Sequence, residues 1–129
     1  MRSKPVLTPG PRHPITIEPA AGRVRVTFAD RVIADTDRAL VLREAGYPPV
    51  HYLPLADVDT AVLEPSTLRT YCPYKGDATY FTLRAGDRIA DDAVWRYESP
   101  YDAVAAIAGH VAFYPQHVTI EQVDEHEPA

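Results

Sequence analysis

The chain has 129 residues, of which 46% are hydrophobic and 24% are charged, as expected for one globular domain with its own core. Its formal net charge of −5 argues against nucleic acid as a partner, because proteins that bind phosphates usually present a basic face. A single cysteine, Cys72, excludes an internal disulfide and a thiolate-rich zinc site, and it favours a reducing cytoplasm. No apolar run approaches the roughly 18 residues that span a bilayer, and no secretory signal is recognisable, so we expect no membrane partner.

The N-terminal segment, residues 1–22, is dense in proline, with Pro5, Pro9, Pro11, Pro14 and Pro19. Proline fixes φ and has no backbone donor, so this segment is predicted to be a tail that lies extended on the domain. Residues 124–129 are predicted to form an acidic tail. The folded domain is therefore expected to occupy residues 23–123.

Short strands separated by turns are predicted along most of this domain. Alternation of apolar and polar residues over Arg23–Phe28 is typical of a half-buried strand, and the polar pair after it predicts a hairpin. The predicted strands are 23–28, 31–34, 38–43, 50–53, 67–72, 78–83, 93–97 and 118–123. Segment 38–43 also fits a short helix, and a helical turn is expected near residues 56–60.

One further helix is predicted at about residues 100–112. Ser99 is a typical N-cap and Pro100 suits the first helical position. The apolar stripe that follows has helical spacing and consists of Val104, Ile107, Ala108 and Val111. Many strands and one late helix predict a mostly β protein, a small antiparallel β-sandwich or barrel with one short helix near its C-terminal end.

Several stretches occur together and in order along this domain. They are 32–36, 39–44, 47–54, 57–58, Thr70 with 72–80, 95–97 and 107–114. Together they resemble the bacterial family catalogued as domain of unknown function 427, elsewhere labelled a nucleotidyltransferase-like domain. The resemblance runs from about residue 23 to residue 123. It implies a compact β-rich domain of uncharacterised function.

The nucleotidyltransferase label requires a glycine turn for the triphosphate and an Asp-x-Asp motif that holds magnesium. Asp57 and Asp59 fit the second requirement, and Gly46 lies upstream at a suitable distance. However, Tyr47 and two prolines follow Gly46 and would crowd a phosphate. Asp57 also fits a simple cap of a helical turn. Magnesium is expected only if this transferase alternative holds.

The stretch Thr70–Gly76, TYCPYKG, contains the only cysteine and one of only two lysines. In a structural interpretation, Pro73 and Gly76 shape a hairpin turn, Cys72 is a small buried residue and Lys75 is a loop tip in water. Alternatively, Lys75 and nearby backbone donors hold a phosphate or carboxylate. A third alternative is that Lys75 lowers the pKa of Cys72 and makes it a nucleophile.

Glu44 ends an apolar strand just before the Pro-Pro turn, and two roles fit it. It is either a salt-bridge partner of Lys75, which the pattern favours, or a general base. The histidines His51 and His110 lack converging ligands, so no metal site is predicted. No cofactor is predicted either.

Eight tyrosines against three phenylalanines suggest aromatic rings at the boundary between core and a wet cleft. We therefore expect an uncharacterised small cytoplasmic domain that binds a small anionic or planar ligand in a pocket. The expected ligand-binding residues are Lys75, Arg69, Tyr52, Tyr74, Tyr80 and Trp95. One alternative is an enzyme, either a nucleotidyl- or phosphoryl-transferase that uses Asp57 and Asp59 or a catalyst that depends on Cys72. Its candidate catalytic residues are Cys72, Lys75 and Glu44. The other alternative is an interaction module that uses the proline tail or a sheet edge. The sequence leaves the ligand's identity and the oligomeric state open.

Overall fold

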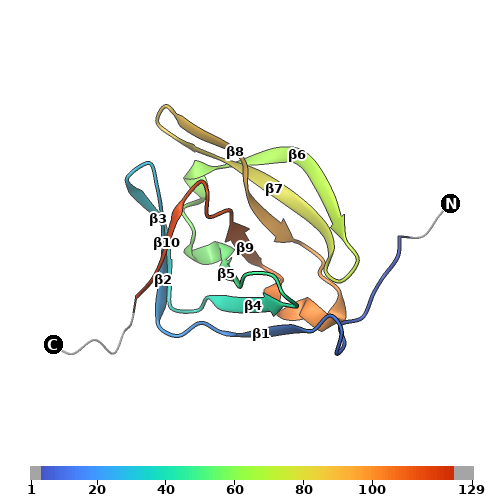
Figure 1. The fold of residues 1–129 in the computed structure, drawn as a ribbon. Helices are drawn as coiled ribbons and strands as arrows, with labels where there is room; N and C mark the ends of the chain where they lie inside the picture. The colour runs from blue at the N-terminus through green and yellow to red at the C-terminus, as the bar shows by residue number, and fades with distance from the viewer. Residues whose placement is uncertain (1–3, 124–129) are drawn as a thin grey trace.

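Antiparallel strands dominate residues 4–123, the part of the chain that the structure, a computed structural model, describes (Figure 1). The predicted acidic tail, 124–129, lies outside the described residues. The strands are β1 (Ile15–Pro19), β2 (Arg23–Phe28), β3 (Arg31–Thr36), β4 (Leu40–Glu44), β5 (Val50–Pro54), β6 (Leu63–Cys72), β7 (Gly76–Ala85), β8 (Arg88–Tyr97), β9 (His110–Phe113) and β10 (Thr119–Val123). Three short 3₁₀ helices complete the described chain, namely η1 (Leu55–Asp57), η2 (Thr60–Val62) and η3 (Asp102–Ile107).

Two sheets organise these strands. The larger has seven strands in the order β1-β4-β5-β9-β8-β7-β6, and the smaller has the order β10-β2-β3. Every strand pair is antiparallel, so the predicted mostly β, antiparallel architecture is confirmed. Both sheets are open within residues 4–123, so the barrel alternative does not apply to this part of the chain.

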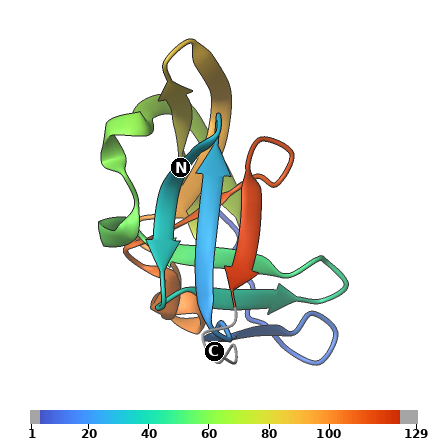
Figure 2. The same ribbon diagram turned by 90° about the vertical axis from the view of Figure 1, so that its left-hand side faces the viewer.

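The smaller sheet covers one side of the molecule, with its strands running crosswise to β1 and β4 (Figure 2). Strand β2 alternates as predicted, and Val24, Val26 and Phe28 are buried. They pack in one apolar cluster with Val94 of β8 and Val111 of β9 from the larger sheet. This shared core holds the two sheets together.

A second apolar cluster lies on the opposite face of the larger sheet, since Tyr52 and Ala112 alternate with Leu53 and Val111 of the first cluster. It includes the buried rings of Tyr52, Tyr80 and Tyr97, together with Val104 and Ile107 of η3. Burying three tyrosines here places phenolic hydroxyls inside the molecule, where each needs a hydrogen-bonding partner.

The structure corrects two details of the predicted elements. Ile15–Pro19 is strand β1 and pairs with β4, so the folded part begins well before residue 23. The late helix is present but is a 3₁₀ helix that ends at Ile107, because Gly109 has φ 75° and His110–Phe113 continues as β9. No helix among the described residues has the length and apolar character that crossing a membrane requires.

Candidate functional site

The TYCPYKG stretch forms the hairpin turn between β6 and β7, as predicted. The Lys75 amide donates to the Cys72 carbonyl at 3.2 Å and closes the turn. Gly76 has φ 112°, in the region that favours glycine, which confirms its predicted role. The turn packs against the segment before η3, since the Tyr101 amide donates to the Lys75 carbonyl at 3.1 Å.

The Lys75 side chain does not extend into water, so that part of the structural interpretation is wrong. The residue is only 8% exposed, and its Nζ lies 2.5 Å from Glu44 Oε1. The salt bridge that the sequence favoured for Glu44 is therefore confirmed. Lys75 Nζ also lies 6.0 Å from the centroid of the Tyr97 ring, so the ammonium sits between a carboxylate and an aromatic ring.

Glu44 also contacts a histidine from the N-terminal segment. Its Oε2 lies 2.7 Å from His13 Nε2, and the His13 ring stacks on Tyr74 with centroids 4.0 Å apart. Burial by itself would raise the pKa of Glu44, but hydrogen bonds from Lys75 and His13 outweigh it and lower that pKa. Glu44 is thus held ionised between two nitrogen groups.

Residues before β1 lie along the same hairpin turn. The Leu7 amide donates to the Pro73 carbonyl at 2.9 Å, and the Tyr71 hydroxyl donates to the Pro5 carbonyl at 2.5 Å. Lys4 forms an exposed ion pair with Asp77. The segment before β1 therefore lies on the domain, and within it Gly10 and His13 close a tight turn that the prediction of an extended tail did not include.

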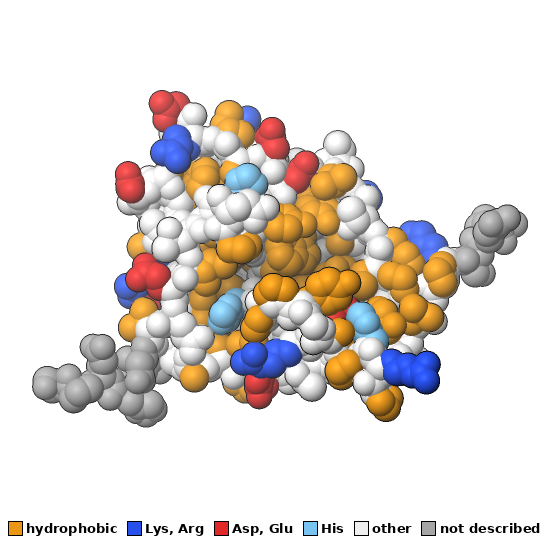
Figure 3. All heavy atoms as spheres, viewed as in Figure 1, with side chains coloured by type: hydrophobic (Ala, Val, Ile, Leu, Met, Phe, Trp, Pro, Cys, Tyr) orange, Lys and Arg blue, Asp and Glu red, His pale blue; other side chains and the backbone are white. Residues whose placement is uncertain are grey.

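A pocket of about 540 Å³ opens beside Glu44. Hydrophobic side chains gather in a hollow near the centre of the face shown in Figure 3. The β4–β5 loop forms one wall of the pocket, and the end of β9 with the residues after it forms another. The lining residues are Glu44, Tyr47, Pro48, Pro49, Val50, His51, Trp95, Phe113, Tyr114, Pro115 and Ile120.

Aromatic side chains make up much of this lining. The rings of Trp95 and Tyr114 lie 4.4 Å apart, and the Trp95 indole Nε1–H donates to the Tyr52 hydroxyl at 3.3 Å. Burial raises the pKa of Tyr52 above its ordinary value, so its phenol stays neutral. Burial and a hydrogen bond with Tyr80 raise the pKa of Tyr114 to about 12. The pocket is therefore built on neutral, internally bonded rings.

The structure separates the predicted ligand-binding residues into four groups. Trp95 lines the pocket, and Tyr52, Lys75 and Tyr80 support it by contacting Trp95, Glu44 and Tyr114 respectively. Tyr74 lies on the other side of Glu44, where it stacks on His13. Arg69 does not line the pocket, because it lies on β6 and donates to the Ser66 and Leu68 carbonyls.

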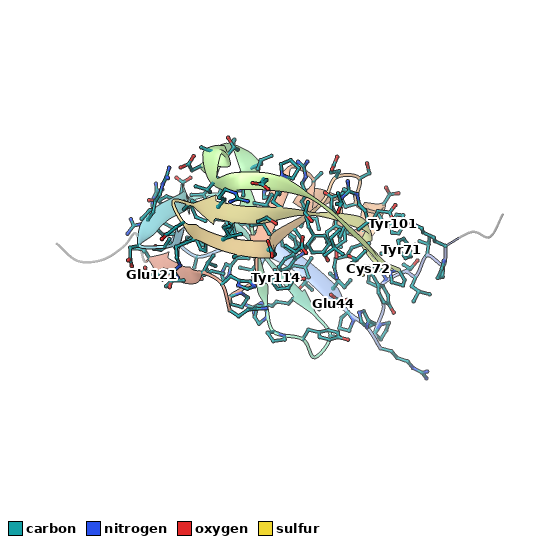
Figure 4. All side chains as sticks on the ribbon, turned by 90° about the horizontal axis from the view of Figure 1, so that it is seen from above. Glu44, Tyr71, Cys72, Tyr101, Tyr114 and Glu121 are labelled. Carbon is teal, nitrogen blue, oxygen red and sulfur yellow. The ribbon has the colours of Figure 1, made fainter. Side chains whose placement is uncertain are left out.

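Of the three candidate catalytic residues, Glu44 and Lys75 contact each other directly. Cys72 is half-buried and packs against the tyrosine cluster of the second core. Cys72 lies with Tyr71 and Tyr101 toward the end of the molecule where the N-terminal segment lies (Figure 4). Glu44 and Tyr114 lie nearer the middle of the molecule. The ion pair of Lys75 is made with Glu44 and not with the thiol.

Asp57 and Asp59 are both engaged by cationic side chains. Thr36 donates to Asp57 at 2.7 Å and Arg38 at 3.2 Å, and these hydrogen bonds lower the pKa of Asp57. Asp59 pairs with Arg31 and caps η2 by accepting from the Ala61 amide, so the capping role falls on Asp59. Within residues 4–123, no cluster of three or more potential metal ligands is found.

Sequence reasoning missed several residues of the site, namely His13, Tyr47, Pro48, Pro49, Phe113, Tyr114 and Pro115. Two of the stretches that carry the family resemblance, 47–54 and 107–114, contain Tyr47 to Pro49 and Phe113 to Tyr114. Membership in these stretches was the one signal that marked these pocket residues. His13 lies among prolines and no pattern marks it.

A family model described as a domain of unknown function, DUF427, matches residues 16–124. The chain belongs to this family. The DUF427 match includes Glu44, Lys75 and every residue that lines the pocket, whereas His13 precedes it. No curated protein matches the chain.

Proposed function

We propose that this DUF427 domain binds a small, flat and largely apolar molecule in the pocket beside Glu44. The observation that carries the proposal is the pocket itself, about 540 Å³ in volume and lined mainly by aromatic rings and prolines. Such a volume is typical of small-molecule sites, in which apolar walls supply affinity and a few polar groups supply orientation. Trp95 and Tyr114 offer ring faces or edges for stacking on a planar group.

The contacts favour the planar ligand of the two that the sequence suggested. An anion would need an unpaired cation, but the ammonium of Lys75 is neutralised by Glu44. The side chain of Arg69 bonds to backbone carbonyls elsewhere. The carboxylate at the pocket would also repel an anionic group.

The enzyme alternatives have less support. A magnesium ion at Asp57 and Asp59 would have to displace the arginines that occupy both carboxylates. A nucleophilic Cys72 would need a neighbouring cation, and the nearby lysine bonds to Glu44.

The interaction-module alternative rests on β6, an edge strand with an exposed Leu68. A cytoplasmic location belongs to this proposal and rests on the single free cysteine.

The single tryptophan makes the proposal directly testable. Trp95 gives the only indole N–H resonance in an amide–nitrogen correlation spectrum, and its ring lines the pocket. Titration with uncharged fused bicyclic aromatic fragments is expected to shift this resonance in a saturable way. Tyr47→Ala removes a side chain at the pocket that is 66% exposed, so it should weaken binding several-fold without unfolding the protein.

Leu68→Ala is the matched control, because Leu68 is 39% exposed on β6 and does not line the pocket. It should leave the affinity unchanged. If no flat fragment shifts the Trp95 resonance, or if both variants weaken binding equally, the proposed function is wrong.

A further inference from the structure

We infer that the ligand is uncharged and donates an N–H hydrogen bond to Glu44. This inference rests on the proposed function and adds the chemical class of the ligand. It identifies Glu44 as the residue that would orient the ligand and select it among flat molecules of similar size.

The acceptor capacity of Glu44 is only partly used. An ionised carboxylate has about four acceptor positions. Lys75 occupies one on Oε1 at 2.5 Å, and His13 occupies one on Oε2 at 2.7 Å. Glu44 is also part of the pocket lining and its side chain is 14% exposed, and we take the remaining positions to face a group that enters the pocket.

Two other polar groups of the lining are already bonded within the protein. The Trp95 N–H donates to Tyr52, and His51 Nε2 lies 3.3 Å from Gln122 Oε1. The lining contains no lysine or arginine. The pocket therefore offers an ionic acceptor and no cationic donor, and the complementary ligand group is a donor.

The charges around the pocket favour a neutral donor over an ionised one. Lys75 compensates Glu44, so the pair carries no net charge, and a ligand cation placed against Glu44 would lie close to the lysine ammonium. An anion would meet the carboxylate directly. A neutral N–H on a flat ring satisfies the carboxylate and leaves the ion pair intact.

Four small molecules that share one ring system test this inference. Indole is neutral and carries an N–H, N-methylindole lacks the donor, indoleacetate is an anion and tryptamine is a cation. Each is titrated into the wild-type protein, and the shift of the Trp95 indole resonance gives its dissociation constant. A hydrogen bond to a charged acceptor makes indole bind about tenfold more tightly than N-methylindole. Indole should also bind more tightly than both ionised analogues.

The protein-side control is Glu44→Gln, checked for folding by its correlation spectrum. It should reduce the preference for indole over N-methylindole, because the amide is a weaker acceptor than the carboxylate. Equal affinities for indole and N-methylindole in the wild type would overturn the inference but leave the proposed function standing. Tightest binding of indoleacetate or tryptamine would overturn the neutral class. Failure of all four to bind, together with failure of the uncharged bicyclic fragments, would overturn both proposals.

Discussion

Lys75 and Lys4 are the only lysines in the chain, and the fold uses them in opposite ways. Lys75 is buried against Glu44, whereas Lys4 pairs with Asp77 in an exposed position. Lys75→Met would leave a largely buried carboxylate with His13 as its remaining partner. We expect it to lower the free energy of unfolding by about 3–5 kcal/mol, as for other broken buried ion pairs. Urea denaturation at neutral pH measures this.

Lys4→Met is the matched control and should change the stability by at most about 1 kcal/mol. Adding Glu44→Leu to Lys75→Met removes the stranded charge and should recover part of the loss. If Lys75→Met and Lys4→Met lowered the unfolding free energy equally, the ion pair of Lys75 with Glu44 would stabilise the protein no more than an exposed ion pair does.

Glu44 also gives the protein an acid-sensitive component of stability. Its pKa in the folded state is below the ordinary value of 4.5, since Lys75 and His13 together outweigh the effect of burial. The unfolded state therefore takes up this proton first as the pH falls, and the unfolding free energy decreases below about pH 4.5. Above that pH the contribution of Glu44 is constant.

Denaturant unfolding of wild type and Glu44→Gln across this acidic range isolates the effect. The variant should have a shallower loss of stability on acidification. Glu18→Gln is the control, because Glu18 forms an exposed pair with Arg43 and should leave the slope nearly unchanged. Identical slopes for wild type and Glu44→Gln would contradict the lowered pKa.

At the level of elements, the β6–β7 turn depends on the backbone conformation of Gly76. The backbone at this position has φ 112°, and a Cβ atom added to it would lie 3.4 Å from the Ser99 carbonyl oxygen. Gly76→Ala should therefore cost about 1–3 kcal/mol of unfolding free energy, measured by urea denaturation. Gly46→Ala in the β4–β5 loop is the control, since nothing lies within 4 Å of its added Cβ. A stability loss no larger than that of Gly46→Ala would contradict a strained turn.

Local sequence patterns predicted most strands correctly, but they predicted the first and last residues of the elements less accurately. The alternation in β2 and the Pro-Gly chemistry of the β6–β7 turn are local, so they are readable from the sequence. Strand β1 was missed because Pro14 and Pro19 suggested a tail, yet β1 begins directly after Pro14 and pairs with β4 up to Pro19, its last residue. The predicted helix was too long because Val111 has helical spacing from Val104. In the structure Val111 is in a strand, since it pairs with Leu53 of β5.

The site was predictable only in part, for residues whose chemistry suggested a partner or a pocket. Glu44 and Lys75 were paired from their chemistry, and Trp95 was placed in a pocket. His13 and Tyr114 reach the same region through long-range strand pairing and through the packing of the N-terminal segment. Such contacts leave no periodic signal in the sequence. Arg69 was a plausible ligand residue by type only, and its guanidinium instead donates to nearby carbonyls on β6.

At the scale of the whole molecule, one core joins both sheets, so the domain should unfold in a single transition. Val26 of β2 is fully buried and belongs to the same cluster as Leu83, Val94 and Val111 of the larger sheet. Val26→Ala removes two carbons and leaves a cavity, which should cost roughly 2–3 kcal/mol. Because the two sheets share this core, the substitution should lower the unfolding free energy of the larger sheet as well, although Val26 pairs with no strand of that sheet.

Trp95 provides the test, since it is the only tryptophan and lies on β8 in the other sheet. Urea unfolding followed by its fluorescence and by far-ultraviolet circular dichroism should give coincident curves, shifted equally by Val26→Ala. Val32→Ala in β3 is the control, because Val32 is 50% exposed and its loss should change stability little. If Val26→Ala moved the dichroism curve but left the Trp95 curve in place, the two sheets would be separate folding units, and the pocket would not depend on the smaller sheet for its stability.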